Sequence, residues 1–227
     1  PIKSNATRVA ALLSGEVDFI RNVPPQDVAK VESTPGMKIM RAPHLRNIFF
    51  GMDQMSPVLK GSGLDKNPLA DVKVRQAIYQ AIDIEGIKRS IMRDASRPTA
   101  IPMAPQLPYY DESLDVRFPY DLEASKKLLA EAGYPNGFEV KMNCPNDRYV
   151  NDASICQAVA ANLARVGVKI NLEAETKGTY FPKILRRDTS FYMLGWTPGT
   201  YDAHNALNAL MACVDDKGAG QFNLGSY

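Results

Sequence analysis

The residues best suited to chemistry stand around the single tryptophan of the chain, and they offer binding rather than catalysis. Gly195 and Trp196 end an apolar run that begins at residue 191, and Thr197 follows them. Glycine lets another group approach the backbone closely, and tryptophan supplies a large, stiff surface with one N–H donor. We therefore expect Gly195, Trp196 and Thr197 to line a binding site.

Tyr201 and Asp202 extend this candidate site into the loop that follows. Two roles are open to Asp202. It stands just before an Ala- and Leu-rich helical pattern, where an aspartate caps the first free amides, or its carboxylate faces a cationic ligand.

The chain has three cysteines, Cys144, Cys156 and Cys213, and only two histidines, His44 and His204. Their spacing fits no zinc pattern, so we expect no metal site. Cys144 ends a strand pattern and Cys156 lies in the helix that follows. A helix that folds back onto its own strand can bring the two together as a disulfide, and the alternative is two buried thiols.

No catalytic constellation is recognisable. Ser14 is not in a nucleophile elbow, neither histidine has an acid and a nucleophile nearby in sequence, and no phosphate-binding glycine motif follows a strand. The adjacent Asp215 and Asp216 have diverging side chains. We expect a protein that is not an enzyme and uses no cofactor.

Composition indicates a globular chain without an electrostatically marked partner. Of the 227 residues, 45% are hydrophobic and 23% charged, and the formal net charge is +2. The densest basic cluster, Lys183, Arg186 and Arg187, is typical of a solvated helix face, so no nucleic-acid partner is expected. No apolar run approaches the ~20 residues that span a bilayer, so we expect no membrane insertion of this fragment.

These candidate residues must be positioned by alternating helices and strands. Helical patterns cover residues 7–15, 71–82, 84–92, 121–132, 151–167, 179–187 and 202–212, with a further helix after residues 24–25. Strand patterns cover residues 17–20, 37–40, 48–52, 138–143, 168–173 and 191–196. The alternation predicts an α/β fold with helices packed on a sheet, and ligands bind beyond the carboxyl ends of such strands. Residues 94–120 are proline-rich and aromatic, and we expect them to wrap over the surface.

Several stretches together resemble the peptide/nickel family (family 5) of extracellular solute-binding proteins of ABC transporters, which includes dipeptide- and oligopeptide-binding proteins. They are ALLSGEVD at residues 11–18, DVKVRQAI at 71–78, AID at 81–83, YDLEASKKLLAEAGY at 120–134, VGVK at 166–169 and GW at 195–196. Each is weak alone, but together they follow the family order across nearly the full chain.

The resemblance implies a periplasmic-binding-protein-like (type II) lobe with a mixed sheet flanked by helices. The family has two lobes that close on the ligand. Residues 1–46 are then the end of the first lobe and the hinge region, residues 47–212 the second ligand-binding lobe, and residues 213–227 a tail. We expect the chain to be a fragment, truncated before that lobe is complete.

The resemblance also implies a function. The full-length bacterial protein would deliver a small-molecule or peptide ligand to an ABC permease, from the periplasm or as a lipoprotein on the outer face of the membrane. The alternative is a solute-sensing module of a signalling system.

Two positions depart from the peptide-binding members. Where those proteins carry an aspartate for the peptide ammonium, this chain has Gly199, and where dipeptide binders carry a carboxylate-binding arginine, an ungapped match gives Asn146. Arg148, two residues on, has a guanidinium suited to a carboxylate, or it is a surface loop residue. We expect a polar or zwitterionic solute rather than an ordinary dipeptide.

Overall fold

The structure is a computed structural model that describes residues 2–59 and 62–227. The chain divides into two compact units. The small unit comprises Pro1–Pro43 and Glu85–Arg97, and the large unit comprises His44–Ile84 and Pro98–Tyr227. How these units correspond to the lobes of the full-length protein stays a prediction.

The small unit contains the helices α1 (Asn5–Leu13) and α2 (Val28–Glu32) and nearly all of α4 (Ile84–Ser90). Its core contains Val9, Leu12 and Val31. The strands expected at residues 17–20 and 37–40 are wrong, because both segments are irregular. Val17, Ile20, Met37 and Ile39 of these segments pack against the helical core, whereas Phe19 and Met40 are exposed. An apolar run of four residues forms a β-strand only if it pairs with another strand, and the local sequence does not reveal whether such a partner is present.

The large unit is built on a four-stranded mixed sheet in the order β1-β4-β2-β3. Its strands are β1 (Asn47–Met52), β2 (Phe138–Pro145), β3 (Val168–Glu175) and β4 (Phe191–Trp196). β2 runs parallel to β3 and β4, whereas β1 runs antiparallel to β4. The expected mixed sheet is therefore present.

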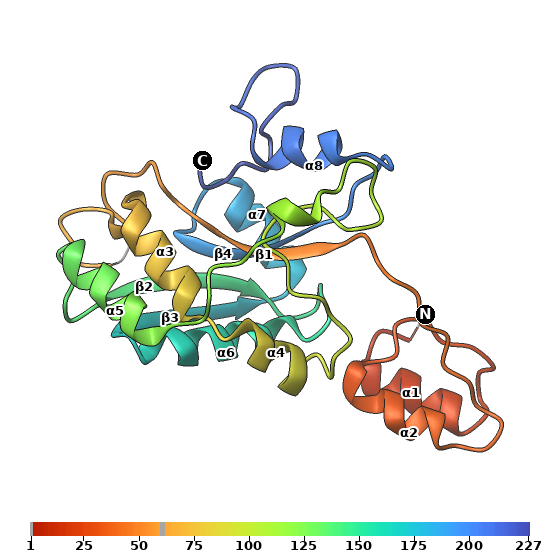
Figure 1. Ribbon diagram of the computed structural model, residues 1–227. Helices are drawn as coiled ribbons and strands as arrows, with labels where there is room; N and C mark the ends of the chain where they lie inside the picture. The colour runs from red at the N-terminus through yellow and green to blue at the C-terminus, as the bar shows by residue number, and fades with distance from the viewer. Residues whose placement is uncertain (1, 60–61) are drawn as a thin grey trace. The chain divides into compact units, whose positions relative to one another are not determined.

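Helices flank this sheet. They are α3 (Val72–Ala81), α5 (Leu122–Glu131), α6 (Asp152–Ala164), α7 (Lys177–Leu185) and α8 (Ala203–Leu210). Figure 1 shows α6 beneath the sheet and α7 and α8 above it. The upper core contains Tyr192 and Leu194 of β4 with Tyr180 and Ile184 of α7, because alternate strand residues point to one face.

Aspartates cap three helices of the large unit. The side chain of Asp71 accepts a hydrogen bond from the amide of Lys73 at the start of α3, and Asp121 caps α5 in the same way. Asp202 caps α8 through the amide of His204. Such a cap stabilises a helix by about 1 kcal/mol.

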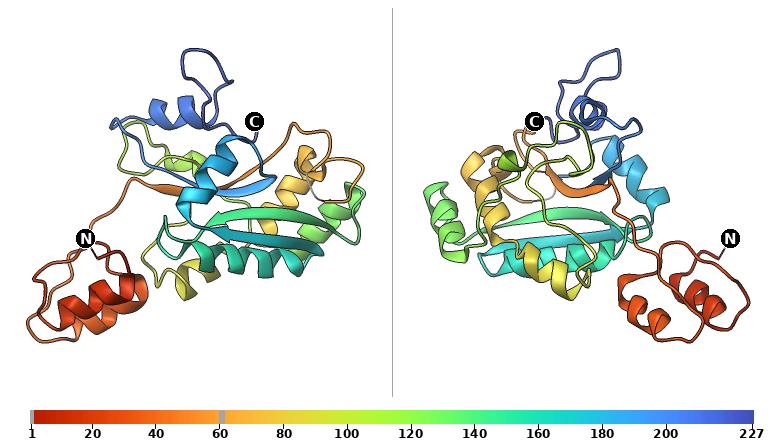
Figure 2. Two further views of the ribbon diagram at one scale, coloured as in Figure 1. Left: turned by 180° about the vertical axis from the view of Figure 1, so that it is seen from behind. Right: turned by 45° about the vertical axis from the view of Figure 1, so that its right-hand side comes forward.

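Residues 98–120 run across the large unit without a long helix or strand, as expected, and include one short 3₁₀ turn (Glu112–Leu114). Figure 2 shows this yellow-green segment crossing the sheet layer. The carboxylate of Asp115 holds it together by accepting hydrogen bonds from Thr99 Oγ1 at 2.8 Å and from Tyr110 Oη at 2.6 Å.

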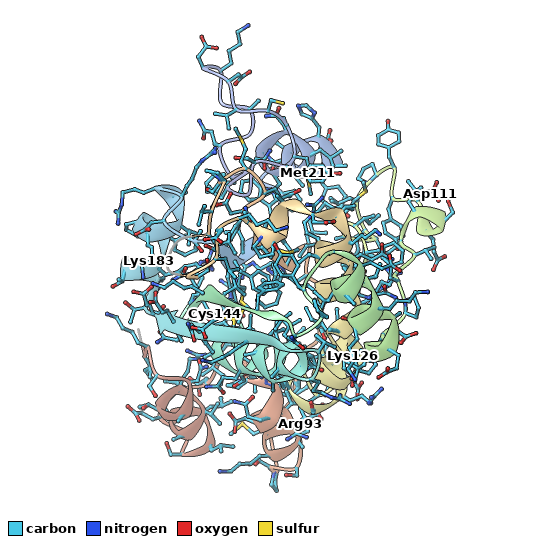
Figure 3. The ribbon with its side chains drawn as sticks, turned by 90° about the vertical axis from the view of Figure 1, so that its left-hand side faces the viewer. Arg93, Asp111, Lys126, Cys144, Lys183 and Met211 are labelled. Atoms are coloured by element: carbon cyan, nitrogen blue, oxygen red, sulfur yellow. A yellow bond between two sulfur atoms is a disulfide. The ribbon has the colours of Figure 1, made fainter. Side chains whose placement is uncertain are left out.

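Two side-chain links tie neighbouring elements together (Figure 3). A disulfide joins Cys144 of β2 to Cys156 of α6, and both cysteines are buried. On α7, Lys183 Nζ lies 2.9 Å from carboxylate oxygens of Glu173 and Glu175 on β3. Cys213 is exposed and unpaired. Throughout residues 2–59 and 62–227, no helix has both the length and the apolar character needed to cross a membrane.

Candidate functional site

Three segments far apart in sequence meet at one edge of the sheet. β2 and β4 are parallel, so their carboxyl ends lie on the same side, where Arg148 follows β2 and Trp196 ends β4. The antiparallel β1 pairs Asn47 with Trp196, which brings Arg46 to the same edge. This edge is where α/β sheets bind ligands.

A cavity of about 270 Å³ lies at this edge, and we call it the arginine cavity. It is lined by Arg46, Arg148, Tyr149, Phe181, Leu194, Gly195, Trp196, Thr197 and Phe222, all from the large unit. Ligand pockets usually measure about 300–1,000 Å³. The arginine cavity therefore has room for one end of a solute.

Tyr149 forms the floor on which the two arginines lie. The guanidinium carbon of Arg148 is 5.1 Å from the centroid of the Tyr149 ring, and that of Arg46 is 5.9 Å from it. Both distances are within the range of cation–π attraction. Burial raises the pKa of the Tyr149 phenol, which stays neutral.

Gly195 makes room for this tyrosine. The Gly195 amide donates a hydrogen bond to Tyr149 Oη at 2.8 Å. A Cβ on Gly195 would lie 2.6 Å from Tyr149 Cε1, closer than real side chains come. The space that a side chain at Gly195 would take is thus filled by Tyr149, a residue of the protein itself, and not by a ligand.

The two arginines have no acidic partner in the residues that the structure describes. Arg46 Nε donates to Thr197 Oγ1 at 3.0 Å, and the Arg148 guanidinium has only the ring contact with Tyr149. Burial lowers the pKa of Arg46, and the nearby charge of Arg148 lowers it further. Two like charges therefore face one cavity without an ion-pair partner among these residues, and the carboxylate of Asp152 lies behind them, where it accepts hydrogen bonds from the Arg148 and Tyr149 amides at 2.9 Å.

A second cavity of about 490 Å³ adjoins the first, and we call it the amide cavity. It is lined by Trp196, Thr200, Asp202, His204, Asn205, Asn208, Ala209, Gly218, Gln221 and Phe222. Trp196 and Phe222 line both cavities, and their ring centroids are 5.0 Å apart. These two rings therefore form a shared wall.

The indole of Trp196 is held in place by the amide cavity. Trp196 Nε1 donates to Asn205 Oδ1 at 3.0 Å, and the Gly199 amide donates to the same oxygen at 3.3 Å. Since its indole N–H is used within the protein, Trp196 has no free side-chain donor to offer to either cavity.

The other predicted site residues lie at different distances from the cavities. Asp202 lines the amide cavity, and one of its oxygens accepts a hydrogen bond from the His204 amide at 2.7 Å, so the capping role is observed. Tyr201 and Asn146 line neither cavity. Tyr201 Oη donates to Gln106 O at 2.6 Å, and Asn146 Nδ2 donates to Ala174 O at 3.4 Å.

Sequence reasoning missed Arg46, Tyr149 and Phe222. Tyr149 had a usable signal, because it follows Arg148 directly in the loop after β2. Arg46 had none, since its place depends on the pairing of β1 with a strand about 150 residues later. Within the described part of the chain, no three His, Cys, Asp or Glu side chains are grouped to hold a metal ion.

An uncharged ring wall beside two guanidinium groups that have no ion-pair partner among the described residues, at the carboxyl edge of an α/β sheet, is suited to binding a small solute. Residues 1–218 match the bacterial extracellular solute-binding proteins, family 5, middle region. The chain belongs to this family, as the resemblance predicted.

Three known proteins illustrate the similarity. Heme-binding protein A of Haemophilus influenzae is 28% identical over 96% of this chain and 39% of its own length. The structure of AgaA from A. tumefaciens R10, in complex with agropinic acid, is 29% identical with a TM-score of 0.70, over 91% of this chain and 40% of that one. DppA from Helicobacter pylori, in complex with the peptide STSA, is 24% identical with a TM-score of 0.78, over 91% of this chain and 38% of that one.

These similarities confirm the fold class, an α/β lobe of the type II periplasmic-binding-protein kind. The chain spans about two fifths of the length of the curated relatives it matches.

Proposed function

We propose that the full-length protein is an extracytoplasmic substrate-binding protein, which captures a small solute and delivers it to the permease of an ABC importer. Membership of family 5 supports this role, and the DppA structure is described as an ABC-transporter-associated periplasmic binding protein. None of the three proteins described above is named for signalling. The protein binds its solute and does not transform it.

The observation that carries the proposal is the arginine cavity. Its polar groups come from Arg46, Arg148 and Thr197, and its walls are aromatic or aliphatic. Polar groups that converge on a cavity beside aromatic walls can orient a small solute. In the full-length protein, residues 47–212 act as the second lobe, and the rest of the protein supplies the opposite wall.

The buried disulfide between Cys144 and Cys156 supports a location outside the cytoplasm. Disulfides persist in the periplasm and on cell surfaces, whereas the cytosol keeps thiols reduced. We propose a periplasmic protein, or a lipoprotein on the outer face of the membrane.

A thermal-shift screen of the full-length protein tests the proposal. The panel contains peptides, amino acids, opines, sugars and nickel, and each hit is repeated on Trp196→Ala and on Phe118→Ala. Phe118 is a matched control because it is aromatic, 54% exposed and outside both cavities. A solute at 100 times its Kd stabilises the protein by about 2.7 kcal/mol, which raises Tm by a few degrees.

We expect at least one solute to raise the Tm of the wild type and of Phe118→Ala but not of Trp196→Ala. If no solute in the panel raises the Tm of the wild type, the transport role is wrong. If a solute stabilises Trp196→Ala as much as the wild type, the site lies elsewhere.

A further inference from the structure

We infer that the arginine cavity selects solutes with a carboxylate next to a flat apolar group and without an ammonium beside that carboxylate. The inference rests on the proposed function and specifies the solute class of the same site. It goes beyond the polar or zwitterionic solute expected from sequence, because the residues that line the cavity favour a negatively charged group on the solute.

The charge of the cavity is the first step of the argument. Arg46 and Arg148 both line it, and none of the described residues that line it is acidic. A cationic or α-ammonium group in this space would meet two guanidinium groups with no carboxylate to balance it. An anion instead offsets the repulsion between the arginines and gains charge-assisted hydrogen bonds.

Contacts within the protein restrain the two arginines, both of which are exposed. Arg46 is anchored by its hydrogen bond to Thr197, and Arg148 lies 5.1 Å from the ring centroid of Tyr149. Tyr149 is itself fixed by the amide of Gly195. Guanidinium groups present paired N–H donors that match the two oxygens of a carboxylate.

The remaining walls favour a flat apolar group. Phe181, Leu194, Trp196 and Phe222 line the same cavity, and the indole N–H of Trp196 is already bonded to Asn205. Ring faces without a free donor pack against flat apolar groups and offer no hydrogen bond to a polar one.

An ammonium group has no acidic side chain in this cavity. The one acidic residue lining the adjoining amide cavity is Asp202, on the other side of the Trp196 and Phe222 wall. Gly199, in the loop after Trp196, has no side chain to offer, and its amide is bonded to Asn205. An amine directly beside the carboxylate therefore finds no acidic partner among the described residues that line this cavity, which disfavours its binding.

Three matched probes test this selection on the full-length protein in 0.15 M salt, which screens non-specific charge attraction. They are 3-phenylpropanoate, its amide 3-phenylpropanamide, and phenylalanine, which adds only the α-ammonium. Binding is measured by isothermal titration calorimetry. We expect 3-phenylpropanoate to bind about tenfold or more tightly than either of the other two.

Variants of the two arginines test whether 3-phenylpropanoate binds in the arginine cavity. Arg46→Gln and Arg148→Gln are each expected to weaken 3-phenylpropanoate binding about tenfold. Arg117→Gln is the matched control, because Arg117 lies 4.5 Å from the Tyr79 ring centroid but outside both cavities, and it should leave binding unchanged. Thermal unfolding of each variant verifies that it folds.

The outcomes separate this inference from the transport role. If the acid, the amide and phenylalanine bind equally, or if the arginine variants bind the acid like the wild type, the inference is wrong even when the solute screen succeeds. If the acid binds selectively but the screen finds no solute, the inference stands and the transport role falls. If nothing binds in either experiment, both are wrong.

Discussion

Replacing Gly195 with alanine should disturb the site through Tyr149. The added Cβ would lie 2.6 Å from Cε1 and 2.9 Å from Cζ of the Tyr149 ring, and 2.5 Å from Ile48 Cδ1. Ile48 is 37% exposed and its terminal methyl can rotate away, whereas Tyr149 is only 8% exposed. The clash must therefore displace the Tyr149 ring or the strand.

The cost follows from two terms. Overpacking a closely packed site costs about 1–3 kcal/mol. Moving the ring also breaks the 2.8 Å hydrogen bond from the Gly195 amide to Tyr149 Oη, which contributes about 0.5–1.5 kcal/mol. We expect Gly195→Ala to lower the free energy of unfolding by about 2–4 kcal/mol.

Urea unfolding followed by circular dichroism measures this change, and a second background isolates its cause. Tyr149→Leu shortens the side chain so that it no longer reaches the position of Cε1 and Cζ. In that background, Gly195→Ala should cost less than about 1 kcal/mol, because contacting residues are not additive. An equal cost in both backgrounds, or a cost below about 0.5 kcal/mol in the wild type, would refute the reasoning.

Three further predictions concern stability. Removing the Cys144–Cys156 disulfide, whose cysteines are 12 residues apart, should lower the free energy of unfolding by about 2–3 kcal/mol, measured with and without reductant in urea. Hydrogen bonds from Lys141 and Lys183 lower the pKa of the Glu173 carboxyl from 4.5 to about 2. The ionised Glu173 carboxylate then contributes to the free energy of unfolding above pH 4.5, and this contribution is lost as the pH falls toward 2. Glu173→Gln should therefore make the free energy of unfolding depend less on pH between pH 4.5 and 2. Asp202→Ala should cost about 1 kcal/mol in urea unfolding by removing the α8 cap, while Asp202→Asn, which keeps an acceptor, should cost much less.

Local sequence signals predicted most of the large unit. Aspartates at 71, 121 and 202 stand where helices begin, and each side chain caps its helix in the structure. Capping and hydrophobic periodicity depend on residues within a few positions of one another, so they are readable without tertiary information. The same signals gave false strands at residues 17–20 and 37–40, where most of the apolar residues pack on the helical core instead.

The candidate site was only partly readable. Trp196, Gly195, Thr197 and Arg148 were predicted and line one cavity. Whether each of them meets a ligand stays a prediction. Asn146 and Tyr201 line neither cavity, because the carbonyls of Ala174 and Gln106 accept their hydrogen bonds.

Local sequence patterns were enough to predict the family, the alternation of helices and strands, and the residue types available at the end of β4. The position of Arg46 beside Arg148 over the Tyr149 ring became visible only in the folded chain. The structure also shows that the Tyr149 ring occupies the space that a side chain at Gly195 would need. The physical reason is that strand pairing joins residues without regard to their separation in sequence. The antiparallel register of β1 on β4, with Asn47 opposite Trp196, sets the charge of the cavity.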